Sequence, residues 1–305
     1  MLTCSWDGLP RPSGRARKPV LHGVRTLRQR RGGFINFVIL LSLPLILLCG
    51  CSSQPTYRET RVAMAPPPVI ESIVYASDGA GDFRISSTQL RKVVQEDCLP
   101  IYIVPFIWSH GYGRVVRDQV DVLNYRIQGK LLADEVLAFH EANPKVPIYL
   151  TGHSAGCSVT LAALENLPPG VVERGVLMSA AMTACYDLRP ALATVKEGIY
   201  VFHSRRDLVY LGAAMRLMKG MSRECSVAAG RVGYRMIADT DEDIALYSKL
   251  HQRAWTPDDR ATGNLGGHYG NYQPDFLRQE VMPLLRGAEP TGPAAIEFEQ
   301  PEEKK

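Results

Sequence analysis

The sequence predicts an α/β fold in which a mostly parallel central sheet is covered by helices on both faces. The main observation is an alternation along the chain: short apolar runs are separated by segments whose apolar residues recur every three or four positions. Such alternation of strands and helices is typical of parallel sheets, because a helix joins each strand to the next and packs on the sheet. The composition agrees with a globular body, since 46% of the 305 residues are hydrophobic and 22% are charged.

Each predicted element corresponds to one segment of this alternation. Strands are predicted at 72–76, 101–107, 146–151, 175–180, 198–204 and 231–237. Helices are predicted at 87–97, 116–142, 155–167, 209–221 and 275–286. The longest helix ends at Asn143-Pro144, and its apolar residues recur every three or four positions, as is typical of a helix. They are Val116, Val120, Leu123, Ile127 and Leu131.

The basic charge of the chain is concentrated at its front end. Residues 1–50 contain eight of the 35 Lys and Arg residues and one of the 31 Asp and Glu residues, so their formal charge is +7 and that of residues 51–305 is −3. The body therefore has no basic surface of the kind that binds nucleic acid. Four arginines between 25 and 31 precede an apolar run at 34–48. This run suits a secretory signal better than a spanning helix, which needs about 20 residues.

The residues after the apolar run resemble a bacterial lipobox. Leu48, Cys49 and Gly50 precede Cys51, and in lipoproteins the chain is cleaved before such a cysteine, which then carries the lipid. The resemblance implies a leader at 1–50, a lipid on Cys51 and a place in the bacterial cell envelope. The alternative is an uncleaved membrane anchor formed by the apolar run 34–48. Residues 51–70 are polar and Pro-rich and are predicted to be a tether.

A folded body is predicted at 71–287, followed by a disordered acidic tail at 288–305. The body contains four cysteines, Cys98, Cys157, Cys185 and Cys225. An oxidising compartment would permit a disulfide, but the sequence leaves the three full pairings open. No cysteine or histidine spacing is typical of a zinc site, so no metal is predicted.

One motif indicates a catalytic serine. Gly152-His-Ser154-Ala-Gly156 lies between a predicted strand and a predicted helix. Gly-x-Ser-x-Gly alone is weak, because chance produces it in roughly one chain in ten of this length. Between a strand and a helix, however, a serine nucleophile needs a strained turn, and a glycine two positions before and after it lets the two elements approach. Ser154 is therefore predicted to be a nucleophile, the alternative being a tight turn rich in small residues.

Because of this motif and the order of the predicted strands and helices, the chain resembles the α/β-hydrolase family over residues 71–286. The family places its acid after a later strand and its histidine near the C-terminus. The resemblance implies that His268, in a Gly-Gly loop before the last helix, is the base. It implies that Asp207, just after a strand, is the acid that fixes the histidine tautomer, with Asp187 as the rival. No cap domain of large size is expected.

The resemblance also implies a pair of backbone N–H groups that stabilise the oxyanion, those of Ala80 and Ala155. Ala80 follows the strand two before the strand of the motif, although Asp78-Gly79 stands where His-Gly is usual. The loop 108–114 does contain His-Gly, which makes Tyr112 the alternative donor, and His110 is expected at the rim of the pocket. Residues 238–267, which include Tyr247, His251 and Trp255, are expected to be an insertion that covers the site.

These expectations combine into a serine hydrolase that needs no cofactor. Ser154 would form an acyl-enzyme with a lipid or small carboxyl ester, at the envelope membrane to which the N-terminus holds the chain. A serine peptidase or acyltransferase would use the same residues on another acyl donor or acceptor. A non-catalytic binding lipoprotein would keep the fold without the reaction.

Overall fold

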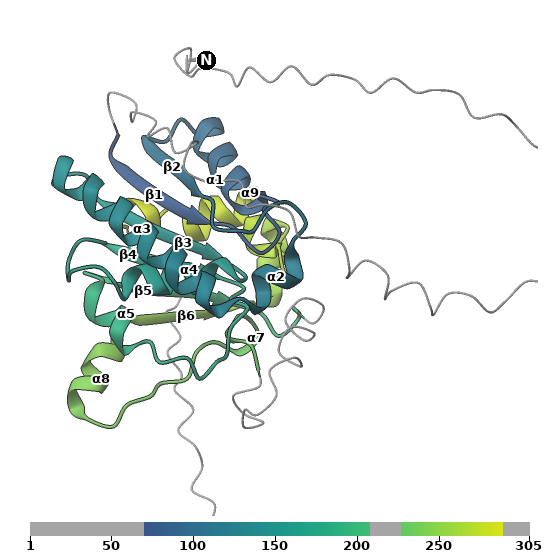
Figure 1. The fold of residues 1–305 in the computed structure, drawn as a ribbon. Helices are drawn as coiled ribbons and strands as arrows, with labels where there is room; N and C mark the ends of the chain where they lie inside the picture. The colour runs from purple at the N-terminus through teal and green to yellow at the C-terminus, as the bar shows by residue number, and fades with distance from the viewer. Residues whose placement is uncertain (1–69, 208–226, 289–305) are drawn as a thin grey trace, which may run out of the picture. The chain divides into compact units, whose positions relative to one another are not determined.

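Six parallel strands form the centre of the protein (Figure 1). The structure is a computed structural model, and it describes residues 70–207 and 227–288. The strands are β1 Ser72–Ser77, β2 Ile101–Phe106, β3 Ile148–His153, β4 Arg174–Met178, β5 Gly198–His203 and β6 Leu250–Ala254. Their order in the sheet is β2-β1-β3-β4-β5-β6, and every neighbouring pair is parallel. Parallel strands need crossover connections, and helices supply most of them.

Helices cover both faces of this sheet, as the sequence predicts (Figure 1). The helices are α1 Ile85–Glu96, α2 Val115–Val120, α3 Val122–Ala142, α4 Gly156–Leu164, α5 Arg189–Thr194, α7 Ala229–Val232 and α8 Asp241–Tyr247. The last part of the chain contains the short helical segments η1 Pro257–Thr262, η2 Gly270–Tyr272, α9 Pro274–Phe276, η3 Leu277–Val281 and η4 Leu284–Arg286. One hydrophobic core joins the sheet to α3, α4 and α5, and a second joins it to α1 and the closing segments. The sheet order and its two covered faces are those of the α/β-hydrolase fold.

The structure divides the longest predicted helix into two. Asp121 ends α2 and caps α3 by accepting a hydrogen bond from the Asn124 N–H, so two helices replace one. The apolar residues Val116, Val120, Leu123, Ile127 and Leu131 are exposed, and the buried residues of α3 are Tyr125, Gly129, Leu132, Ala133 and Val136. The reason is the close approach of α3 and α4. A Cβ on Gly129 would overlap the Ala162 Cβ and would lie 2.8 Å from the Ala162 carbonyl carbon, so no large side chain fits there.

The prediction of the last strand was also wrong. Residues 229–232 form α7, and the sixth strand is β6, inside the segment 238–267 that was expected to cover the site. Tyr247 is fully buried and His251 stacks on Tyr200 of β5, so both belong to the body of the fold. β6 is an edge strand, which explains the error. Its sequence is Leu-His-Gln-Arg-Ala, and only its first residue is completely buried, so it lacks the apolar run of a central strand. The Gln252 side chain holds the backbone of Tyr234 through two hydrogen bonds of 2.6 and 2.9 Å.

Several predictions concern parts of the chain outside the described residues: the leader, Cys51 and its tether, the helix 209–221 and the tail. Of the body cysteines, Cys157 is a free, buried thiol, whereas Cys98 and Cys185 each take part in a disulfide. In the ranges 70–207 and 227–288, no helix is both long enough and apolar enough to cross a membrane. The connection between β4 and β5 contains only the short helix α5.

Candidate active site

Ser154 lies in the turn between β3 and α4 and has a φ of 53°, which side-chain-bearing residues rarely adopt. The flanking glycines make this turn sterically feasible. A Cβ on Gly152 would lie 2.7 Å from the Cys157 Cα, and one on Gly156 would lie 2.8 Å from the Ser77 carbonyl carbon. Both distances are too short for a real Cβ. The strained strand–turn–helix geometry predicted from the motif is therefore present at this serine.

The structure brings Asp207 and His268 together. Asp207 follows the carboxyl end of β5, and His268 lies in the loop before η2. The distance from His268 Nδ1 to Asp207 Oδ2 is 2.6 Å, and only 6% of His268 and 2% of Asp207 are exposed. The rival carboxylate has another partner, since Asp187 accepts hydrogen bonds from the Arg189 guanidinium, which lowers the pKa of Asp187. Asp207 is thus the carboxylate that orients His268.

His153 connects the base to the serine turn. Its Nε2–H donates to the backbone carbonyl of His268 over 3.1 Å, and the two ring centroids are 4.7 Å apart. Burial, reinforced by the neighbouring His268, lowers the pKa of His153 to about 3, so this imidazole is neutral near pH 7. The sequence places His153 within the serine motif but gives no indication of this contact. No local signal could have revealed this bond, because its partners lie 115 positions apart.

The loop after β1 lies directly against the serine. A Cβ on Gly79 would lie 3.3 Å from the Ser154 Cβ and 3.0 Å from His153 Nδ1. Within the described part of the chain, the backbone N–H groups of Ala80 and Ala155 donate to no protein acceptor. Two uncommitted N–H groups next to a serine are what an oxyanion site requires.

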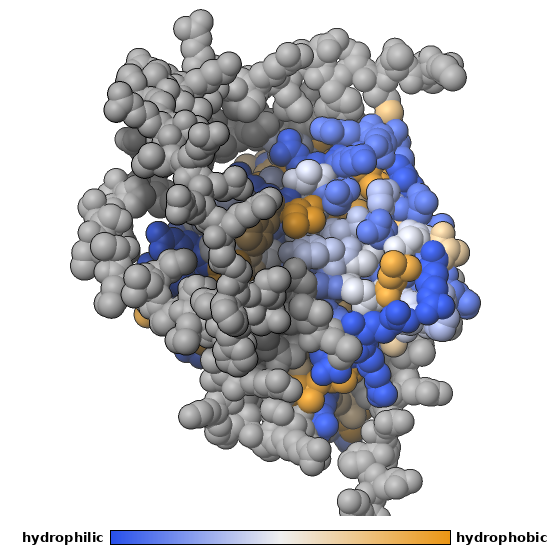
Figure 2. All heavy atoms as spheres, turned by 90° about the vertical axis from the view of Figure 1, so that its right-hand side faces the viewer, coloured by the Kyte–Doolittle hydropathy of each residue, from blue (hydrophilic) through white to orange (hydrophobic). Residues whose placement is uncertain are grey.

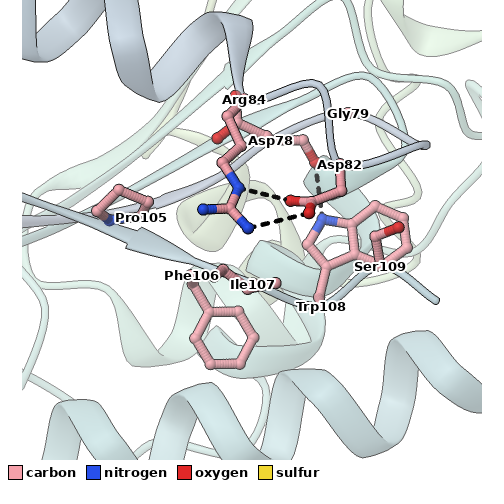
Figure 3. Close-up of a pocket in the computed structure, with 9 residues that line it drawn as sticks. All are labelled: Asp78, Gly79, Asp82, Arg84, Pro105, Phe106, Ile107, Trp108 and Ser109. Atoms are coloured by element: carbon pink, nitrogen blue, oxygen red, sulfur yellow. Dashed lines mark hydrogen bonds and ion pairs between the residues drawn. The ribbon is translucent and has the colours of Figure 1, made fainter. Parts of the chain in front are cut away.

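Asp78 holds this loop in place, which explains the departure from the usual His-Gly. Its carboxylate accepts hydrogen bonds from the Ser86 hydroxyl and, over 3.0 Å, from the Ser87 N–H at the start of α1. The Trp108 indole N–H donates to the Asp78 carbonyl over 2.7 Å (Figure 3). Both the side chain and the backbone of Asp78 are therefore fixed.

The alternative oxyanion loop packs on the outside of the first one. Tyr112 is 80% exposed, and its ring contacts Phe83 edge-on with centroids 5.3 Å apart. His110 lies between two carboxylates, with Nδ1 2.8 Å from Asp118 and Nε2 3.3 Å from Asp121. The fully buried Asp118 also accepts the Gly81 N–H over 2.7 Å. His110 and Asp118 thus connect the two loops to each other.

Two small hollows adjoin these loops. One, of about 220 Å³, is lined by residues that include Asp78, Gly79, Asp82, Arg84 and Trp108, and an Asp82–Arg84 ion pair crosses it (Figure 3). The other, of about 170 Å³, lies beside the site, because Ala80, Phe83, Ile85, His153 and Tyr269 are among its walls. No cluster of three or more His, Cys, Asp or Glu residues in the ranges 70–207 and 227–288 has the arrangement of a metal site.

Solved structures with a similar arrangement have low sequence identity to this chain. A predicted CIB-like hydrolase from Thermoplasma acidophilum is 11% identical over 70% of this chain and 85% of its own, with a TM-score of 0.38. An esterase from Pyrococcus furiosus is 11% identical over 68% and 83%, also at 0.38. The catalytic core of acetyl xylan esterase from Trichoderma reesei is 13% identical over 68% and 98%, at 0.35.

No protein-family model matches the chain, and no curated protein matches it either. At such identities and TM-scores, the similarity to solved structures carries no argument about activity. The α/β-hydrolase assignment rests instead on the sheet order and on the places of Ser154, Asp207 and His268 along the chain.

Proposed function

We propose that this protein is a serine hydrolase that cleaves carboxyl esters through an acyl-enzyme on Ser154. The observation that carries the proposal is the buried 2.6 Å contact between His268 Nδ1 and Asp207. His153 holds this pair at the strained serine turn. The proposed nucleophile, base and acid come from three separate segments. The contacts of His153 and Asp207 support a base close to the serine turn, at the carboxyl ends of the strands where parallel α/β sheets bind their ligands.

Each residue would have a defined role in the reaction. With the Nδ1–H donated to Asp207, the lone pair of His268 lies on Nε2 and can accept the proton of the Ser154 hydroxyl. The serine oxygen then bonds to the ester carbonyl carbon, and the Ala80 and Ala155 N–H groups stabilise the negative oxygen that forms. His268 returns the proton to the departing alcohol. A water molecule, deprotonated by His268 in turn, releases the acid and restores Ser154.

Small or lipid esters are the proposed substrates, at the surface of the cell envelope. The hollow beside the site is small, and its walls combine the partly exposed Phe83 and Ile85 with the polar Asp78, Arg84, Ser86 and His153. Phe83 and Ile85 would supply apolar contacts to an acyl or alkyl group near this loop. The envelope location is supported by the basic residues, the apolar run 34–48 and Cys51 at the front of the sequence.

Labelling by a fluorophosphonate probe tests the proposal. We expect the full chain to react with the probe and to hydrolyse esters of short acids, and Ser154→Ala to lose both activities while remaining folded by circular dichroism. Ser158→Ala is the matched control, because Ser158 lies one turn along α4 and its hydroxyl donates to the Met182 sulfur. A wild-type chain that neither labels nor hydrolyses esters, or a Ser154→Ala variant that does both, would refute the proposal and favour a binding protein.

A further inference from the structure

Helices α2 and α3 expose large apolar side chains on successive turns of their outer surface. We call these residues the α2–α3 stripe: Val116, Val120, Leu123, Ile127 and Leu131. Their exposed fractions are 73, 55, 67, 50 and 40%. Isolated apolar residues are normal on a protein surface, but a row of five in sequence marks a surface that binds something.

The exposure of the stripe is a built-in property of the fold. The inner face of α3 is fixed by the contact of Gly129 with Ala162 of α4 and by buried Leu132 and Val136. Rotating the helix to hide the stripe would drive large side chains into α4, where a single Cβ already overlaps. The protein therefore keeps the small residues of α3 inside and presents the large ones to its surroundings.

The stripe is continuous with the candidate active site. At its N-terminal end, a Cβ on Gly81 would lie 2.8 Å from the Val115 side chain, so α2 begins against the loop that carries Ala80. Phe83 and Tyr112 extend the apolar surface across this loop and are 42 and 80% exposed. A surface bound to the stripe would therefore lie beside the entrance to the site.

Cationic side chains border the stripe. Arg117 lies next to Val116, Arg126 is three residues after Leu123, and Lys130 is three residues after Ile127, so each is a neighbour of the stripe on the helix surface. All three are exposed, as is Arg114 just before α2. Figure 2, which views the molecule from the side of α2 in Figure 1, shows hydrophobic atoms at the surface among strongly hydrophilic ones.

Between positions 114 and 130, the acidic residues do not cancel these charges fully. Asp118 is buried in its hydrogen bonds to the neighbouring loop, Asp121 contacts His110, and Lys130 forms an exposed ion pair with Asp134. Residues 114–130 contain four basic and two acidic residues, a formal charge of +2, whereas residues 51–305 as a whole have −3. The other acidic residues of α3, Asp134, Glu135 and Glu141, lie in its last part. An apolar stripe with cationic borders is the chemistry that binds an anionic lipid surface.

We propose that the α2–α3 stripe docks on the surface of an anionic lipid bilayer. The chain outside the structure fits this occupant, because the apolar run 34–48 and Cys51 precede the first described residue. The 19 positions from Cys51 to Ile70 can span at most about 65 Å, enough to pass around a domain of this size. This inference concerns the orientation of the body and does not depend on the proposed ester hydrolysis.

A local fluorescent reporter tests the docking in the full chain. The chain is reconstituted with vesicles of phosphatidylglycerol and phosphatidylcholine whose acyl chains carry bromine, which quenches tryptophan in contact with the lipid. Leu123→Trp places the reporter on the stripe. Ile244→Trp is the matched control, because Ile244 is an apolar residue of α8 with 54% exposure that lies away from α2 and α3 (Figure 1). The signal is the difference from the wild-type chain, which has three tryptophans.

Both variants share the same N-terminal segment, so any difference between them reports the orientation of the body. We expect quenching of about twofold or more at position 123, where an interfacial apolar face enters the lipid by about 5–10 Å, and little at position 244. Arg126→Gln with Lys130→Gln should weaken the quenching on anionic vesicles and bring it to the level seen on neutral ones.

Two outcomes would overturn the inference. Equal quenching at both positions would mean that the N-terminus alone holds the chain and that no face is preferred. A reporter at position 123 that is already shielded from aqueous quenchers without vesicles would mean that another protein segment covers the stripe. Concentration dependence of that shielding would identify a second copy of the chain, and its absence the chain's own apolar run.

Discussion

The role proposed for Asp207 depends on which ring nitrogen of His268 carries the proton. A carboxylate that accepts from Nδ1–H leaves the lone pair of His268 on Nε2, where it can act as a base, whereas an amide at the same position can donate to Nδ1 and favour the wrong tautomer. We expect Asp207→Asn to lower kcat by about 10³–10⁴-fold with little change in KM. Asp187→Asn is the control and should leave kcat unchanged, because Asp187 pairs with Arg189. Steady-state kinetics on a short-chain ester measure both variants, and a loss confined to Asp187→Asn would reassign the acid.

His153 makes the stability of the fold depend on pH. Its pKa is about 3 in the folded protein and about 6.5 in an unfolded chain, so between these values only the unfolded state binds the proton. The free energy of unfolding should therefore decrease as the pH falls from 6.5 towards 3, by up to about 1.4 kcal/mol per pH unit from this residue.

His153→Gln should make that pH dependence shallower, because glutamine keeps an N–H donor and does not titrate in this range. Urea unfolding at several pH values measures the slope. His203, whose pKa burial lowers to about 4, contributes to the same slope in both proteins and cancels in the comparison. Identical slopes would show that His153 takes up its proton in the folded state as readily as in the unfolded one.

At the scale of elements, Gly129 determines the distance between α3 and α4. In an isolated helix, Gly→Ala stabilises by about 1 kcal/mol. Here the new methyl group meets the backbone of Ala162, and overpacking of this kind costs about 1–3 kcal/mol. We expect the second effect to dominate, so Gly129→Ala should lower the free energy of unfolding in urea. Gln128→Ala, one position earlier in α3, is the control for helix propensity. A stabilised Gly129→Ala variant would mean that the two helices can separate without loss.

The same contact shows what the sequence could and could not predict. Five of the six strands, their order along the chain and the serine turn follow from local patterns, because apolar runs and the two motif glycines encode them directly. The orientation of α3 does not, since its sequence offers an apolar stripe with helical spacing and the structure buries a face that contains Gly129 and Ala133. The packing of α4 determines which face of α3 is buried, because α4 leaves room only for small residues at the contact. β6 was missed for a related reason, because an edge strand needs few apolar residues.

The candidate site also has features that the sequence could predict and features that it could not. The strained turn at Ser154 and the pairing of Asp207 with His268 could be predicted, because a motif and a chain order indicate them. The residues that position them could not. His153 acts through a backbone carbonyl far along the chain, and Asp118 acts by joining two loops that the sequence gives no reason to pair. Such positioning contacts depend on the fold as a whole, and no short pattern represents them.

At the scale of the whole molecule, the distribution of charge separates a basic front end from a body with a slightly negative balance. The front end carries a formal charge of +7 over 50 residues. If the chain is cut before Cys51, this charge is lost and only the cationic border of the α2–α3 stripe remains to attract an anionic bilayer. Lipid and stripe would then act together, since two weak membrane contacts on one chain bind far more tightly than either alone.

Lipid attachment at Cys51 gives the last prediction. A diacylglyceryl group contributes about 0.8 kcal/mol per buried methylene, and two acyl chains suffice for stable anchoring. We therefore expect the mature chain from its native host to begin at Cys51, to carry the mass of a lipid and to partition into detergent. Cys51→Ser should leave either an uncleaved precursor held by the run 34–48 or a chain released from the membrane. Cys49→Ser is the matched control and should still be lipidated, because Cys51 is the cysteine that follows Gly50 in the motif. Mass spectrometry of the N-terminus distinguishes these cases, and an unmodified Cys51 would leave the apolar run as a plain membrane anchor.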